Sequence, residues 1–177
     1  MGGKFNLSRR LCGLAVAVAV GTGALCAASV MAVASTNEVT PYHNNDRAFH
    51  FDFSFFQTTA ADSLEVKHNS TSTYVCIDSI TVPDANLYVD GGPSEATSLV
   101  NCMGGTTAKV KKGMATGQYC IRNLVYERFG KSGTATCQLT GWSNRETGYV
   151  EGVWSPDSLR SYTPLNGYCN PNIWQVL

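Results

Sequence analysis

The sequence lacks the residue spacings that mark common metal sites and catalytic centres. It has three histidines in 177 residues, no C-x-x-C or H-x-x-x-H pair, and after residue 34 its closest cysteines are 17 positions apart. Structural zinc sites need closely spaced cysteine and histidine ligands, so we expect no metal and no cofactor. No motif of a catalytic centre is present, so we name no catalytic residue and expect a noncatalytic protein.

An excess of basic charge is also missing. The chain has 13 basic and 13 acidic side chains, and loss of Lys4, Arg9 and Arg10 with an amino-terminal segment would leave 10 basic side chains. The remaining protein would carry a net charge of −3, which gives no reason to expect a nucleic-acid partner. No apolar run after residue 34 is long enough to span a bilayer, so we expect no membrane partner once that segment is removed.

The first 34 residues have the pattern of a cleaved signal peptide. A basic start is followed by an uncharged stretch of 24 residues, 11–34, and by the small residues Ala32, Val33 and Ala34 before Ser35. Signal peptidases accept such small residues at the cleavage site. We therefore expect a signal peptide at 1–34, a flexible segment at 35–47, a single β-rich domain at 48–177, and a secreted, extracellular product. A retained membrane anchor is the alternative, because the stretch is long enough to cross a bilayer.

Five cysteines remain after cleavage, and an odd number cannot pair completely. They are Cys76, Cys102, Cys120, Cys137 and Cys169. Since disulfides persist in oxidising compartments, we expect four of the five to form two bridges. Their connectivity stays open among 15 arrangements. We expect Cys169 to tie the carboxy-terminal tail to the domain, and the leftover thiol could link two chains into a dimer.

The strongest structural signal after the signal peptide is an alternation of aromatic and polar residues at 48–56. Phe49, Phe51, Phe53 and Phe55 occupy one face of the expected strand, and His50 and Asp52 occupy the other. A period of two is typical of a half-buried strand. The pattern predicts that the four phenylalanines face the core.

Seven further runs have the composition of strands and are separated by glycine, proline and aspartate turns. They cover 73–82, 86–89, 98–102, 107–111, 118–128, 134–139 and 148–154. Turns are expected at 90–93 among others, residues 59–72 are expected to form a loop, and no segment has a convincing helical pattern. The chain is thus predicted to be all-β, a single antiparallel β-sandwich, with an irregular β-barrel as the alternative.

Two pairs of ionisable residues invite a catalytic interpretation. His50 and Asp52 share a strand face and lie close enough for proton transfer. Glu127 and Glu151 each fall in a strand-like run, as the paired carboxylates of small β-sandwich glycosidases do. Alternation alone also places polar residues on the solvent face, and neither pair belongs to an identifying motif.

Aromatic residues near the carboxy terminus suggest a binding surface. Trp154 shares a face with Val150 and is expected in the core, whereas Trp142 follows a strand and is the better candidate for exposure. Exposed aromatic rings stack on sugar rings. Trp142 and Tyr149 are therefore our candidate ligand-stacking residues.

Several short phrases resemble those of a loose group of small, secreted β-rich proteins of Gram-positive bacteria. The phrases are 69–75 (NSTSTYV), 87–91 (LYVDG), 139–142 (LTGW) and 152–158 (GVWSPDS), within residues 48–165. Because these proteins are uncharacterised, the resemblance implies export and a compact β domain. It implies no activity, no catalytic residue and no particular disulfide.

These observations favour a secreted, disulfide-stabilised, noncatalytic module that binds a cell-surface, host or glycan ligand. A small hydrolase of carbohydrate or cell-wall material is the first alternative. A structural or inter-bacterial factor held through the odd cysteine is the second.

Overall fold

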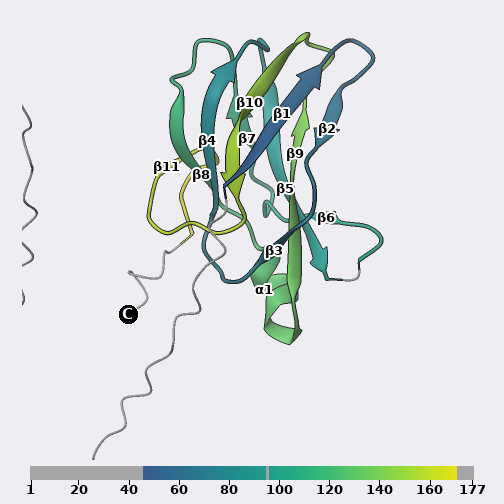
Figure 1. The fold of residues 1–177 in the computed structure, drawn as a ribbon, viewed down its shortest axis with the longest axis vertical. Coiled ribbons are helices and arrows are strands. Elements are labelled where there is room, and N and C mark those ends of the chain that lie inside the picture. The colour runs from purple at the N-terminus through teal and green to yellow at the C-terminus, as the bar shows by residue number, and fades with distance from the viewer. Residues whose placement is uncertain (1–45, 95, 171–177) are drawn as a thin grey trace, which may run out of the picture. The chain divides into compact units, whose positions relative to one another are not determined.

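The computed structural model describes residues 46–94 and 96–170 (Figure 1). The expected signal peptide at 1–34, the cleavage site before Ser35 and nearly all of 35–47 lie outside the described residues. No helix of the described part is long and apolar enough to cross a membrane.

The described domain is a β-sandwich, as the sequence predicted. Sheet A has the order β1 (Arg47–Phe53), β10 (Gly148–Ser155), β4 (Thr73–Ile80), β8 (Gly117–Ile121) and β11 (Thr163–Pro164). Sheet B has the order β2 (Thr59–Ala61), β9 (Ala135–Trp142), β5 (Ala85–Pro93) and β6 (Val100–Asn101), while β3 (Glu65–Lys67) pairs with β9 and β7 (Ala108–Val110) with β5. All these pairings are antiparallel except that of β11 with β8.

Strand β1 places its phenylalanines between the two sheets. Phe49, Phe51 and Phe53 are 4%, 2% and 3% exposed. They pack closely enough that a Cβ added at Gly141 of β9 would lie 2.8 Å from the rings of both Phe51 and Phe53. The prediction for Phe55 is wrong: it is 55% exposed. Strand β1 ends at Phe53, and the next residue, Ser54, closes a turn by donating its N–H to the Gln57 carbonyl at 2.9 Å.

The predicted turn at 90–93 is also wrong, because β5 continues through Gly91 and Gly92 to Pro93. A Cβ at Gly91 would lie 2.6 Å from a methyl group of Val125, and one at Gly92 would lie 2.8 Å from the Cβ of Ala96. These glycines are needed for close packing rather than for chain reversal.

Other boundaries differ from the sequence prediction. The expected strand 118–128 ends at Ile121 and is followed by α1 (Val125–Phe129) and a 3₁₀ turn (Gly130–Ser132), which lie below the sheets in Figure 1. Within the expected loop 59–72, β2 and β3 have three residues each, too short to show a period of two. The run 98–102 contains only the two-residue β6, and the run 134–139 extends to Trp142 as β9.

A buried ion pair joins the two sheets at one end of the sandwich. Lys67 of β3 contacts Asp157, which follows β10, with 3.0 Å between Nζ and Oδ1 and side-chain exposures of 0% and 1%. The Lys67 ammonium also donates to the carbonyls of Thr71 at 2.7 Å and Pro156 at 2.6 Å. The second oxygen of Asp157 accepts the His68 N–H at 3.0 Å. All three ammonium protons therefore have an acceptor.

Candidate functional site

The outer face of sheet B, on the side away from the core, holds an aromatic and polar surface. Strand alternation directs Asn86, Tyr88 and Asp90 of β5 outward, and Thr140 and Trp142 of β9 outward. The register pairs Tyr88 with Thr140 and Asn86 with Trp142. Tyr88 and Trp142 are therefore diagonal neighbours, whose Cα atoms lie about 7–8 Å apart.

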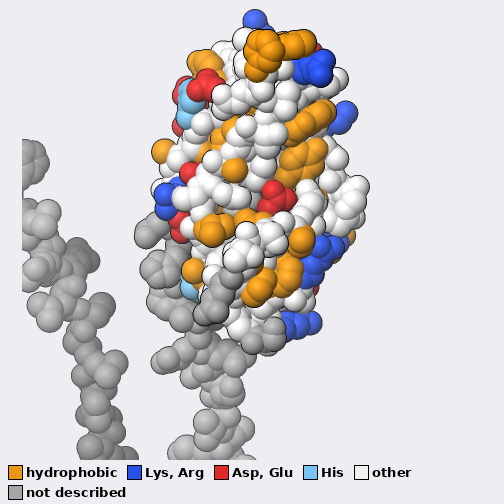
Figure 2. Space-filling view, turned by 90° about the vertical axis from the view of Figure 1, so that its right-hand side faces the viewer, with side chains coloured by type: hydrophobic (Ala, Val, Ile, Leu, Met, Phe, Trp, Pro, Cys, Tyr) orange, Lys and Arg blue, Asp and Glu red, His pale blue; other side chains and the backbone are white. Residues whose placement is uncertain are grey.

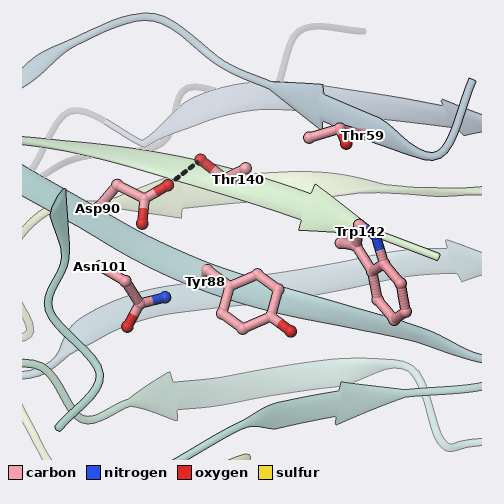
Figure 3. Close-up of a pocket in the computed structure, with 6 residues that line it drawn as sticks. All are labelled: Thr59, Tyr88, Asp90, Asn101, Thr140 and Trp142. Atoms are coloured by element: carbon pink, nitrogen blue, oxygen red, sulfur yellow. Dashed lines mark hydrogen bonds between the residues drawn. The ribbon is translucent and has the colours of Figure 1, made fainter. Parts of the chain in front are cut away.

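These side chains surround a shallow hollow of about 360 Å³, within the size range of small-ligand sites. Its lining residues are Thr59, Tyr88, Asp90, Asn101, Thr140 and Trp142 (Figure 3). Trp142 is 38% exposed and Tyr88 is half-buried. The hollow thus combines two aromatic rings with four polar groups drawn from β5, β9, β6 and the edge strand β2.

Two of the polar groups are held in place by the protein. The Thr140 hydroxyl donates to one carboxylate oxygen of Asp90 at 2.8 Å. Asn101 lies opposite Asp90 on β6, and its side-chain oxygen accepts the Met103 N–H at 3.0 Å. In Figure 3 the Asn101 amide nitrogen points toward Tyr88. The hollow therefore offers a carboxylate acceptor and an amide donor beside the aromatic rings.

The neighbourhood of this surface is mixed rather than strongly charged. Figure 2 views the domain from the side on which β2 and β6 lie in Figure 1. Hydrophobic side chains are spread over this face, an acidic group lies near its centre, and basic side chains gather mainly toward the margins. Such a surface suits a ligand with both apolar and hydroxyl groups.

The sequence suggested Trp142 and Tyr149 as candidate ligand-stacking residues, and the structure places them on different sheets. Tyr149 lies on β10, on the outer face of sheet A, where its ring stacks on His50 with 5.1 Å between the centroids. Tyr149 and Trp142 therefore belong to different sheets and form no common platform. The partner of Trp142 is Tyr88, and the alternation of Asn86, Tyr88 and Asp90 was the signal that could have found it.

The comparisons with known proteins gave one match. Residues 30–158 match the family described as "Protein of unknown function (DUF2712)". The chain belongs to this family. Neither the curated proteins nor the solved structures contained a match. The DUF2712 match agrees with the resemblance to uncharacterised proteins, and it assigns no activity to the hollow.

On the outer face of sheet A, the DUF2712 domain gathers a second polar cluster around His50. Its Nδ1 lies 2.9 Å from Glu151 Oε2, and its Nε2 lies 3.2 Å from Asp52 Oδ1. The hydrogen bond with Glu151 is the main cause that raises the pKa of His50 above 6.5, and Asp52 adds to it. The described residues contain no group of three His, Cys, Asp or Glu side chains arranged to hold a metal ion.

The carboxylates considered for a glycosidase do not come together on one element or face. Glu127 lies on α1, which contacts β5 and β9 of sheet B, whereas Glu151 is on the outer face of sheet A. The prediction of a strand at Glu127 is wrong, and the solvent-facing position predicted for Glu151 is confirmed.

One disulfide, not two, is present among the five cysteines of the domain. Cys120 of β8 is bonded to Cys169, while Cys76, Cys102 and Cys137 are free. The expectation that four of the five pair is therefore wrong for this structure. Burial raises the pKa of the Cys137 thiol to about 12 and that of Cys102 above its usual value. Both thiols stay protonated near neutral pH, which makes them poor nucleophiles.

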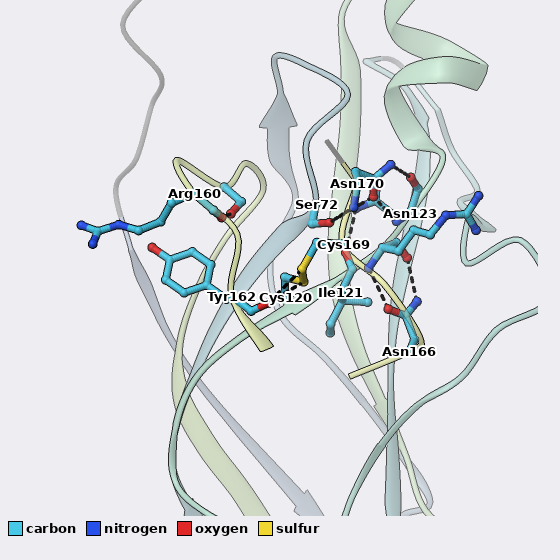
Figure 4. Close-up of a disulfide and its surroundings, with 11 residues drawn as sticks. Ser72, Cys120, Ile121, Asn123, Arg160, Tyr162, Asn166, Cys169 and Asn170 are labelled. Carbon is cyan, nitrogen blue, oxygen red and sulfur yellow. Dashed lines mark hydrogen bonds between the residues drawn. A yellow bond between two sulfur atoms is a disulfide. The ribbon is translucent and has the colours of Figure 1, made fainter. Parts of the chain in front are cut away.

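The disulfide fastens the carboxy-terminal segment to sheet A, as predicted for Cys169 (Figure 4). Asn170 reinforces this attachment: its N–H donates to the Ser72 hydroxyl at 2.6 Å, and its Oδ1 accepts the Asn123 N–H at 3.0 Å. The ring of Tyr162 packs against that of Tyr74, with 4.8 Å between the centroids. Cys169 lies beyond the residues that match the family, so the family match does not bear on this bridge.

Proposed function

We propose that this protein is exported and that its β-sandwich is a noncatalytic module that binds carbohydrate on the outer face of sheet B. The observation that carries the proposal is the exposed ring of Trp142 beside Tyr88, in a hollow that also holds Asp90, Asn101 and Thr140. Aromatic faces supply apolar contact area for sugar rings, and convergent polar groups fix the orientation of the hydroxyls.

The position of the aromatic residues supports a binding role over a packing role. Trp154 satisfies the packing role in the core, where it is completely buried and its indole N–H donates to Asp62. Trp142 instead keeps 38% of its surface exposed on the outer face of sheet B. A rigid ring on a strand is available for stacking with little conformational entropy to lose.

Export is supported by the signal-like pattern at 1–34 and by the Cys120–Cys169 bridge, because disulfides are typical of oxidising compartments. Binding to a cell-surface protein would use the same exposed face and is an alternative outcome of the experiment below. The geometry does not support the hydrolase alternative, because Glu127 and Glu151 lie on different elements and faces.

The test is a binding screen of the oxidised domain against soluble polysaccharides by affinity electrophoresis. We expect Trp142→Ala and Tyr88→Ala each to weaken binding about tenfold, the factor that about 1.4 kcal/mol of lost stacking produces. Tyr149→Ala is the matched control, because it removes an aromatic ring from the opposite outer face. The proposed site would be contradicted if the polysaccharide still slowed the migration of both sheet B variants. It would also be contradicted if Tyr149→Ala weakened binding as much as the sheet B substitutions do.

A further inference from the structure

The charge of the hollow indicates which class of sugar it takes. Asp90 is the single ionisable acid or base among the lining residues, apart from the phenol of Tyr88. A carboxylate on a surface that recognises ligands favours a positively charged group and repels a negatively charged one.

The Asp90 carboxylate is not neutralised by the ion pairs of the described residues. Those ion pairs join other acids to Arg47, His50 and Lys67. Arg128 approaches β6, but its guanidinium donates to the Asn101 carbonyl at 3.0 Å. The negative charge of Asp90 is therefore available to a ligand.

The arrangement around Asp90 leaves one carboxylate oxygen directed into the hollow. Thr140 occupies the other oxygen through its 2.8 Å hydrogen bond. Figure 3 shows the second oxygen pointing toward the space between Asn101 and Tyr88. An ammonium group placed there would form a charge-assisted hydrogen bond with Asp90 and would lie close to an aromatic ring, which also attracts cations.

Lys109 of β7 pairs with Asn86 and lies on the same outer face of sheet B, beside the aromatic hollow. Lys109 and Lys111 line a different hollow, together with Asp84, Pro83 and Met114. Neither lysine lines the aromatic hollow itself, and Asp90 is the one charged side chain among its lining residues.

We propose that the aromatic hollow of sheet B binds a sugar that carries a protonated amino group. This inference rests on the proposed carbohydrate binding and adds the charge of the ligand to it. The amine pairs with Asp90, the pyranose ring stacks on Trp142 or Tyr88, and the Asn101 amide donates to a ring or hydroxyl oxygen.

The test compares three oligosaccharides of similar length at pH 6 by isothermal titration calorimetry. The probes are hexaglucosamine, which is cationic, hexa-N-acetylglucosamine, which is neutral, and hexagalacturonate, which is anionic. We expect the cationic probe to bind about tenfold more tightly than the neutral one and the anionic probe not to bind. Raising the salt concentration should reduce the preference for the cationic probe, because exposed charges are screened.

The matched variants are Asp90→Asn and, on the outer face of sheet A, Asp78→Asn. Asp90→Asn keeps an oxygen that can accept the Thr140 hydrogen bond and removes only the charge. It should lower affinity for hexaglucosamine about tenfold and so abolish the preference for the cationic over the neutral probe. Asp78→Asn should change neither affinity, which controls for the general loss of negative charge.

The possible failures are distinguishable. If the neutral probe binds as tightly as the cationic one in a manner that depends on Trp142, carbohydrate binding stands and the amino-sugar inference is overturned. An Asp90→Asn variant that keeps the cationic preference, or a wild-type domain that binds hexagalacturonate, also overturns it. If none of the three probes binds, this inference fails, and the wider polysaccharide screen decides the proposed function.

Discussion

The buried ion pair between Lys67 and Asp157 gives the sharpest test of how this domain is held together. We predict that Lys67→Met destabilises the domain by about 3–5 kcal/mol, the cost of leaving one partner of a buried pair without the other. The carboxylate of Asp157 would remain 1% exposed and would keep the His68 N–H as a partner, but it would lose the ammonium. The Thr71 carbonyl would lose the ammonium that it contacts at 2.7 Å.

A loss of this size is a large part of the stability of a domain, which is typically about 5–15 kcal/mol. The measurement is urea unfolding at pH 7, followed by tryptophan fluorescence. Lys109→Met is the matched control, because Lys109 is an exposed lysine on β7, and it should cost less than about 0.5 kcal/mol.

The double variant Lys67→Met with Asp157→Leu tests whether the loss of stability comes from the charge that a single substitution leaves unpaired. Replacing both charges with apolar groups removes the uncompensated charge, so the double variant should be more stable than Lys67→Met alone. The two single losses should therefore not add. A cost below about 1 kcal/mol for Lys67→Met, or additive costs in the double variant, would refute this reasoning.

Three further predictions concern the core, the disulfide and the histidine cluster. Phe51→Ala should lower the free energy of unfolding by about 3–5 kcal/mol and His50→Ala by less than about 1 kcal/mol, because their side chains lie on opposite faces of β1. Equal losses in denaturant unfolding would mean that the buried face of β1 is assigned wrongly. Replacing Cys120 and Cys169 with alanine should lower the free energy of unfolding by about 4 kcal/mol, because the bridge joins residues 49 positions apart. Alkylation of the unreduced, denatured domain should label three thiols, and five labelled thiols would disprove the bridge. His50 should titrate above pH 6.5 by NMR and closer to 6.5 in Glu151→Gln. Because the pKa of His50 is raised in the folded state, protonated His50 stabilises the fold fully below its unfolded-state pKa of about 6.5, and this stabilisation is lost as pH rises through the folded-state pKa. The exposed position of His50 keeps the stabilisation below about 1 kcal/mol. An unchanged His50 titration in Glu151→Gln would contradict the assignment.

Only part of the candidate site could be predicted from the sequence. The exposure of Trp142 followed from its place at the end of a strand-like run, and the structure confirms it. Its true neighbour, Tyr88, is 54 positions away in the sequence and comes beside it only through the pairing of β5 with β9. Tyr149 is much closer in sequence, but the chain crosses from sheet B to sheet A between the two residues.

The same limit applies to the glycines and the cysteines. Gly91 and Gly92 look like turn residues in the sequence, and their role in β5 depends on Val125 and Ala96. Val125 belongs to α1, which lies far from Gly91 in the sequence, whereas Ala96 follows shortly after the end of β5. The count of five cysteines predicted disulfides, but a bond requires Cα atoms within about 7 Å, a distance that depends on the whole fold.

By itself, the sequence determined that this chain builds an all-β domain and that one face of β1 is buried, because a strand repeats every two residues and the alternation of phenylalanine with polar residues is local. It also determined that Cys169 had the position to anchor the tail. The tertiary structure alone decided that Cys120 is its partner, that Lys67 meets Asp157 across the sandwich, and that Tyr88, Asp90 and Trp142 share a hollow. The physical reason is that strand register and sheet packing bring together side chains from segments far apart in the chain, and no local pattern encodes which strands become neighbours.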